Sequence, residues 1–138
     1  MIRVIDPKDL SLHFLNVKDD CLITADASYS LPDYVWTKEM LRIWAREVPA
    51  WLDKFDCDDI SFLFKARMQS LHAAGHGKTD GVACGVVFYH RDRGGGHAIC
   101  WVVTVINGEQ KLIYIEPQTG EEICLSRQES ESRWFVYA

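Results

Sequence analysis

Residues 97–116, HAICWVVTVINGEQKLIYIE, decide the fold, because two apolar runs rich in β-forming residues meet there at Asn107-Gly108. An Asn-Gly pair between two such runs is typical of a two-residue type I′ turn, in which both central residues take positive φ. The stretch therefore predicts an antiparallel hairpin that reverses at Asn107 and Gly108.

The same turn sets the register of the hairpin. If Ile106 lies opposite Glu109, then Ile99 lies opposite Glu116, and residues that face one another share a face of the sheet. His97 is two residues from Ile99 and shares that face, which makes it a diagonal neighbour of Glu116. The hairpin thus predicts that the Glu116 carboxylate reaches the His97 imidazole.

In the rest of the chain, apolar residues recur first with the period of a helix and later with the period of a strand. Helices are expected from Thr37, as the cap, to Val48, and from Asp56-Cys57 until Gly75 stops the second one. Strands are expected at residues 2–5, 21–25, 82–90, 97–106, 110–116, 121–125 and 133–137, with residues 126–132 as a polar connection. The pattern predicts an α+β fold in which N-terminal helices pack on a C-terminal antiparallel sheet, in a single domain of residues 1–138.

Composition narrows the classes of function. A chain of 138 residues with 48% hydrophobic content can build one core. Its net charge of -5 argues against a nucleic-acid partner, because Lys and Arg dominate affinity for phosphate backbones. No apolar run approaches the length of a membrane span, and five cysteines without a close pair are typical of a reducing compartment. We therefore expect a cytoplasmic protein with no membrane partner.

Cys57 is the cysteine placed for nucleophilic chemistry. A thiolate is favoured in the first turn of a helix, where unpaired amides and the helix dipole supply partial positive charge. The other four cysteines fall in expected strands, where thiols behave as small hydrophobes. His97 follows Gly94–Gly96, which open an approach to its ring, and Glu116 would orient that ring, with Gln118 as the alternative orienter.

Three short motifs carry a resemblance to a known family: Asp56-Cys57-Asp58-Asp59 opening a helix, Gly96-His97-Ala98 opening a strand, and Ile115-Glu116-Pro117-Gln118 ending the next strand. They resemble the papain-like protease domain of the fungal agglutinins related to the fairy-ring mushroom lectin, a domain type also similar to uncharacterised phage and bacterial proteins. The resemblance implies that Cys57 is the nucleophile, His97 the general base and acid, and Glu116 the orienter. The sequence requires no cofactor, and the resemblance implies a possible calcium ion whose ligands it does not assign.

The expected function is therefore that of a thiol hydrolase, a cysteine peptidase that forms an acyl-enzyme on a protein or peptide substrate. One feature opposes it, because a second oxyanion donor is missing near Cys57 unless Asn16, Lys38 or the Trp51 indole is brought close. This keeps two alternatives open: a catalytically silent binding or inhibitor module, for example one encoded by a phage and directed at a host protein, and a transglutaminase-like acyl transferase. Arg91 and Arg93 are expected to be solvated charges at a hairpin tip, with an acidic partner as the alternative.

Overall fold

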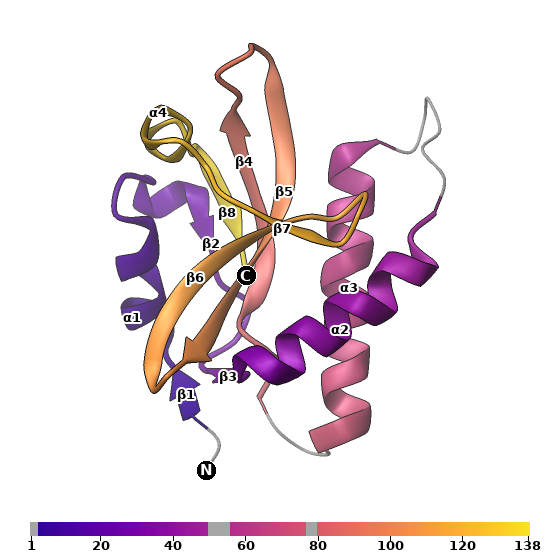
Figure 1. Ribbon diagram of the computed structural model, residues 1–138. Helices are drawn as coiled ribbons and strands as arrows, with labels where there is room; N and C mark the ends of the chain where they lie inside the picture. The colour runs from indigo at the N-terminus through magenta and orange to yellow at the C-terminus, as the bar shows by residue number, and fades with distance from the viewer. Residues whose placement is uncertain (1–2, 50–55, 77–79) are drawn as a thin grey trace.

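The structure is a computed structural model that describes residues 3–49, 56–76 and 80–138. Its elements, in chain order, are β1 (Arg3–Ile5), α1 (Pro7–Ser11), η1 (Leu12–Phe14), η2 (Asp19–Cys21), β2 (Leu22–Ile23), β3 (Tyr29–Leu31), α2 (Tyr34–Glu47), α3 (Cys57–His76), β4 (Cys84–His90), β5 (Gly96–Ile106), β6 (Glu109–Glu116), β7 (Glu121–Ile123), α4 (Arg127–Glu131) and β8 (Phe135–Tyr137) (Figure 1).

A six-stranded sheet in the order β2-β8-β4-β5-β6-β7 forms the centre of the fold, and β1 pairs with β3 in a separate two-stranded sheet. The α+β class is confirmed. The sheet differs from the expected antiparallel one in a single pairing, since β2 runs parallel to β8. These two strands lie far apart in the sequence, so no tight turn forces them to be antiparallel.

The β5–β6 hairpin has the register expected from its turn. Ile106 pairs with Glu109 and Cys100 pairs with Ile115. Asn107 has a φ of 51°, and Gly108 after it has a φ of 82°. Among the described residues, Asn107 is the one non-glycine residue with a positive φ. Such angles at both central positions are those of a type I′ turn.

Both faces of the sheet are buried, which explains the long apolar run of β5. Ile99, Trp101 and Val103 enter the core on the side of α1 and η1. Cys100 and Val102 point to the other side and pack against residues of α2 and α3. In Figure 1 these two helices lie on one side of the sheet and α1 lies on the other. The sheet is thus the middle layer between two groups of helices.

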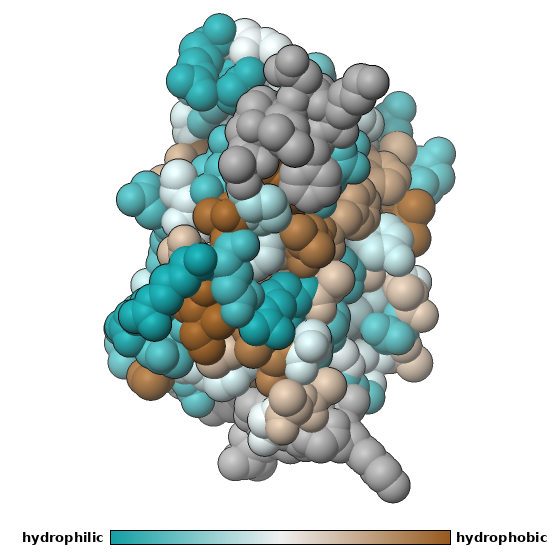
Figure 2. All heavy atoms as spheres, turned by 90° about the vertical axis from the view of Figure 1, so that its right-hand side faces the viewer, coloured by the Kyte–Doolittle hydropathy of each residue, from teal (hydrophilic) through white to brown (hydrophobic). Residues whose placement is uncertain are grey.

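The face covered by α2 and α3 has hydrophilic and hydrophobic side chains interspersed over its surface (Figure 2). Large apolar side chains exposed on these two helices include Val35 of α2, 75% exposed, and Phe62 and Leu63 of α3, each 41% exposed. Within the described residues, none of the helices combines the length and the apolar character that a membrane crossing requires.

Both long helices differ from expectation at one end. The α2 helix begins at Tyr34, three residues before the expected cap, because the Asp33 side chain accepts from the Trp36 amide at 2.8 Å. Thr37 is buried inside the helix, where its Oγ1 donates to the Asp33 carbonyl. The α3 helix begins at Cys57 as expected but continues past Gly75 to His76. A single glycine lowers helix stability without ending the helix.

The segment expected to be a polar connection contains the short helix α4. Ser126 and Glu129 form a capping box, in which the Ser126 Oγ accepts from the Glu129 amide at 3.0 Å and Glu129 Oε1 accepts from the Ser126 amide at 3.1 Å. Serine followed three residues later by glutamate is the sequence signature of this motif. The sequence therefore carries the signal for a helix at this position.

We expect Ser126→Ala to lower the free energy of unfolding by about 1 kcal/mol, because one amide of α4 loses its acceptor. Urea unfolding monitored by tryptophan fluorescence measures the change. Gln128→Ala is the control, since Gln128 is exposed on the same helix and its side chain is outside the capping box. Equal midpoints for the two variants would contradict a stabilising role for the box.

Candidate functional site

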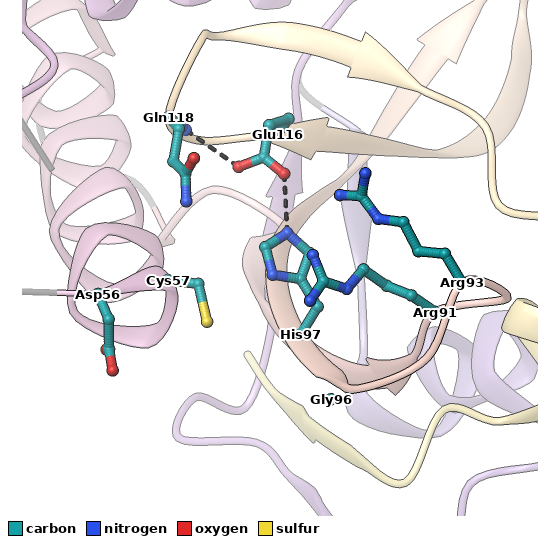
Figure 3. A pocket seen from close by; sticks show the side chains of 8 residues that line it. All are labelled: Asp56, Cys57, Arg91, Arg93, Gly96, His97, Glu116 and Gln118. Atoms are coloured by element: carbon teal, nitrogen blue, oxygen red, sulfur yellow. Dashed lines mark hydrogen bonds and ion pairs between the residues drawn. The ribbon is translucent and has the colours of Figure 1, made fainter. Parts of the chain in front are cut away.

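An open pocket of about 590 Å³ lies where α3 begins, beside the β4–β5 hairpin and the end of β6. Its lining consists of Asp56, Cys57, Arg91, Arg93, Gly96, His97, Glu116 and Gln118 (Figure 3). The structure therefore brings together in one pocket all three residues predicted as the site, Cys57, His97 and Glu116. Gln118, the alternative orienter, lines it as well.

His97 and Glu116 make the contact that the hairpin register predicts. The His97 Nε2 donates to Glu116 Oε2 at 2.9 Å, and the two side chains are 11% and 20% exposed. The other carboxylate oxygen, Oε1, accepts from the Gln118 amide at 3.2 Å. The Tyr89 ring meets the imidazole edge to face at 5.9 Å. The orientation of the imidazole is thus fixed from two sides.

The turn after β6 holds Glu116 in place. The amide of Gly120 donates to the Glu116 carbonyl at 2.9 Å, and the Trp44 indole of α2 donates to the Pro117 carbonyl at 2.6 Å. Gly120 has a φ of 77°, and a Cβ there would lie 3.1 Å from the Leu41 carbonyl oxygen. The turn therefore packs directly on α2, which connects the pocket to the helical layer.

Cys57 is the first residue of α3, and the Ile60 amide donates to the Asp56 carbonyl just before it at 3.0 Å. Its sulfur points to the side of the pocket where His97 lies (Figure 3). Cys84 and Cys100 are buried in the sheet, and burial raises the pKa of the Cys84 thiol to about 12 and that of Cys100 well above its usual range. Those two thiols are therefore core residues, as expected.

Two of the three candidate oxyanion donors are held elsewhere in the structure. Within the described residues, the Cys57 thiol and the His97 ring share no hydrogen bond. The Asn16 side chain donates to the carbonyls of Ser130 and Glu131, so it does not reach the pocket. Lys38 lies over the Tyr34 ring. Trp51, the third candidate for an oxyanion donor, is outside the described residues.

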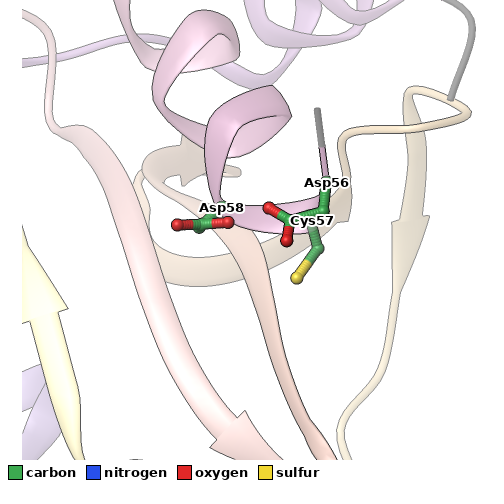
Figure 4. Close-up of side chains that lie close together, drawn as sticks. All are labelled: Asp56, Cys57 and Asp58. Atoms are coloured by element: carbon green, nitrogen blue, oxygen red, sulfur yellow. The ribbon is translucent and has the colours of Figure 1, made fainter. Parts of the chain in front are cut away.

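Asp56, Cys57 and Asp58 form a cluster at the start of α3, with one donor atom from each within 4.8 Å of the others (Figure 4). A hydrogen bond with Asp58, together with some desolvation and the negative charges of Asp58 and Asp59, raises the pKa of the exposed Asp56 carboxyl. Calcium takes about six to eight oxygen ligands. This cluster supplies oxygens from two residues and a sulfur from the third, so it does not fit the calcium ion that the family resemblance implied.

Arg91 and Arg93 lie on the wall of the pocket formed by the β4–β5 hairpin, opposite the start of α3 (Figure 3). Their expected description as solvated charges at a hairpin tip is therefore incomplete. The sequence held a usable signal, because a hairpin that ends a few residues before His97 must place its tip near that ring. What the sequence could not show was the direction in which the two guanidinium groups point.

The fold and the pocket define an α+β domain with an open polar site where a helix begins beside a β-hairpin. The chain belongs to the Agglutinin C-terminal family, whose model matches residues 28–122. No curated protein matches the chain.

Two solved structures share the fold. One is described as "PSL1a-E64 complex", with a TM-score of 0.75 and 19% sequence identity. The other is the Polyporus squamosus lectin "bound to human-type influenza-binding epitope Neu5Aca2-6Galb1-4GlcNAc", with a TM-score of 0.72 and 19% identity. The matches cover 98% of this chain but 51% and 49% of the other two. The chain thus spans about half the length of each structure.

The comparisons correct the function expected from the sequence. The family is one of agglutinins and a solved neighbour is described as a lectin, which are names of carbohydrate-binding proteins. The prediction of a cysteine peptidase, and of an enzyme more generally, is therefore wrong, and so is the transglutaminase-like alternative. The alternative of a phage-encoded inhibitor directed at a host protein is wrong for the same reason. Its broader class, a binding protein, agrees with the family. The resemblance to fungal agglutinins is confirmed at the level of the family, and its protease part is not.

Proposed function

We propose that this chain is a carbohydrate-binding domain and that its ligand occupies the pocket lined by Cys57, His97 and Glu116. The observation that carries the proposal is the chemistry of the lining, in which six of the eight residues offer a carboxylate, guanidinium, amide or imidazole group. Sugars present many hydroxyl groups, each of which donates and accepts hydrogen bonds. A polar, open pocket suits such a ligand better than it suits an apolar one.

Each side of the pocket would make a different kind of contact with a sugar. Glu116 is fixed by His97 and by the Gln118 amide, and its carboxylate has further lone pairs to accept from ligand hydroxyls. The Gln118 side chain can donate and accept at the same time. Cys57 closes the pocket at the start of α3. Membership of an agglutinin family supports a sugar as the ligand in place of the peptide first expected.

We expect Glu116→Gln to weaken glycan binding about tenfold, because a hydrogen bond to a charged group contributes roughly 1.5–3 kcal/mol. Isothermal titration with Galβ1-4GlcNAc and with Neu5Acα2-6Galβ1-4GlcNAc measures the affinity, after a glycan array has identified other ligands. Glu109→Gln is the matched control, since it makes the same chemical change at the exposed opposite end of β6.

Two results would overturn the proposal. The first is a wild-type protein that binds none of the glycans on the array while remaining folded by circular dichroism. The second is hydrolysis: if the wild type cleaves a denatured protein substrate and Cys57→Ala does not, the pocket performs chemistry and the binding assignment falls. We expect neither the wild type nor Cys57→Ala to yield fragments.

A further inference from the structure

The tip of the β4–β5 hairpin, which carries both arginines of the pocket, is held by the short helix α4. The Asp92 amide donates to Glu129 Oε2 at 3.2 Å. The other oxygen of the same carboxylate, Oε1, accepts from the Ser126 amide at 3.1 Å and closes the capping box of α4. A single carboxylate therefore joins the start of α4 to the segment between Arg91 and Arg93, although Glu129 itself does not line the pocket.

The end of α4 makes a second contact with the hairpin. The Ser132 hydroxyl accepts from the His90 amide at 2.9 Å, and the same oxygen lies 3.1 Å from the His90 carbonyl oxygen and 2.7 Å from the Glu129 carbonyl oxygen. Two residues further on, the Trp134 amide donates to the Phe88 carbonyl at 3.0 Å. The segment from Ser126 to Trp134 thus follows one side of the hairpin up to its tip.

The helix that holds the hairpin is itself anchored to the rest of the molecule. The Asn16 side chain donates to the carbonyls of Ser130 and Glu131 at 2.9 and 2.8 Å. The Arg133 guanidinium donates to the Ser130 carbonyl at 2.8 Å and to the Tyr114 hydroxyl of β6 at 2.7 Å. Because α4 is fixed to two separate parts of the chain, it can act as a rigid support. Both Asn16 and α4 lie outside residues 28–122, which the family model matches.

The arginines depend on such a support, because ion pairs do not hold them. Within the described residues, neither Arg91 nor Arg93 takes part in an ion pair, and the Arg91 Nε has no hydrogen-bond partner there. Their direction therefore follows from the course of the hairpin backbone. Gly94 and Gly95, with φ of 92° and 84°, follow directly, and glycine leaves a backbone more conformational freedom than any other residue.

We infer that Glu129 is a positioning residue for the pocket, which from outside the lining keeps Arg91 and Arg93 across the pocket from Cys57. The two guanidinium groups then raise the electrostatic potential on the Cys57 side, and this effect falls as they move away. Without the carboxylate, the hairpin tip keeps the Ser132 contact but loses the one nearest to the arginines. The inference concerns the wall of the pocket and holds whether or not the ligand is a sugar.

The test uses two thiol reagents of different charge, iodoacetate and iodoacetamide. Both alkylate a thiolate with loss of iodide, so the fraction of thiolate cancels in the ratio of their rates, and the ratio reports the local potential. Mass spectrometry of the peptide that contains Cys57 measures both rates, with the exposed Cys124, which does not line the pocket, as the reference within the same protein. We expect the double variant Arg91→Gln, Arg93→Gln to lower the iodoacetate-to-iodoacetamide ratio at Cys57 about fivefold.

Glu129→Gln is expected to lower the same ratio about threefold, toward that of the double arginine variant, because one amide oxygen cannot replace both carboxylate oxygens. The sign is informative. Loss of the negative charge of Glu129 would by itself raise the ratio, so a fall reports displacement of the arginines. Glu131→Gln is the matched control, since it removes the same charge from an exposed position of the same helix, and its ratio should equal or slightly exceed that of the wild type.

Ser126→Ala separates the position of the hairpin from the stability of α4, because it weakens the capping box and leaves the contact between Glu129 and Asp92 in place. We expect it to keep the wild-type ratio. A ratio in Glu129→Gln at or above that of the wild type would overturn the inference, and so would an equal fall in Ser126→Ala. A double arginine variant with the wild-type ratio would show that the arginines do not act on Cys57 and would also overturn it. Failure of glycan binding would change none of these ratios, so the two proposals can fail separately.

Discussion

Gly85→Ala is expected to abolish cooperative folding. Gly85 lies in the middle of β4, and a Cβ at this position would come within 1.8 Å of the Tyr137 carbonyl oxygen and 2.7 Å of the Trp101 ring. Tyr137 belongs to β8, which pairs with β4, and Trp101 is fully buried opposite Gly85 on β5. Neither backbone nor a buried indole can move away cheaply, so we expect a loss of well over ~3 kcal/mol, beyond ordinary overpacking.

The measurement is urea unfolding, followed by fluorescence and by far-UV circular dichroism. Gly75→Ala is the matched control, because a Cβ at Gly75 in α3 has no heavy atom within 4 Å. Alanine favours the helix over glycine, so this control should gain about 0.5–1 kcal/mol. A Gly85→Ala protein with the wild-type midpoint would show that β4 and β8 do not approach as closely as described.

Trp44→Phe is expected to lower both the stability and the ligand affinity of the pocket. The Trp44 side chain is 2% exposed, packs edge to face on Phe64, and donates from its indole to the Pro117 carbonyl. Phenylalanine keeps an aromatic ring but leaves that buried carbonyl without its donor, which costs about 1–3 kcal/mol, and the smaller ring adds a cavity. The turn that carries Glu116 then loses its link to α2.

Thermal unfolding measures the change in stability, and titration with the glycan proposed as the ligand measures the change in affinity. Trp134→Phe is the control, since Trp134 is 48% exposed and does not line the pocket. We expect the control to change stability by less than about 0.5 kcal/mol, as surface substitutions usually do. A destabilised Trp44→Phe protein with unchanged ligand affinity would mean that the turn keeps its position without the indole.

The part of the fold that the sequence could predict depends on contacts between residues close in the chain. Asn107-Gly108 determines the β5–β6 register, and from that register the contact between His97 and Glu116 follows by arithmetic. The start of α3 at Cys57 follows from the apolar spacing after it. The parallel pairing of β2 with β8 could not be predicted, because it joins distant segments and no local pattern records it.

The function could not be read from the same residues. A thiol, an imidazole and a carboxylate in one pocket are typical of nucleophilic catalysis, but they also form an ordinary polar lining for a hydroxyl-rich ligand. The sequence does not specify which contacts the neighbouring side chains make, such as the hydrogen bonds of Asn16 to carbonyls of α4. Only the structure shows that Arg91 and Arg93 line the pocket, because the sequence does not give the direction in which the β4–β5 hairpin projects.

The tight turn at Asn107 and Gly108 restricts which insertions the β5–β6 loop can accept. Side chains alternate between the two faces of a strand, so a one-residue insertion that kept a two-residue turn would shift the register, bring Ile115 beside His97 and turn Glu116 to the opposite face. Inserting two residues would preserve which face each side chain occupies. A one-residue insertion would therefore keep the contact between His97 and Glu116 only if the loop itself lengthened to three residues, although the loop lies at the far end of the hairpin from the pocket.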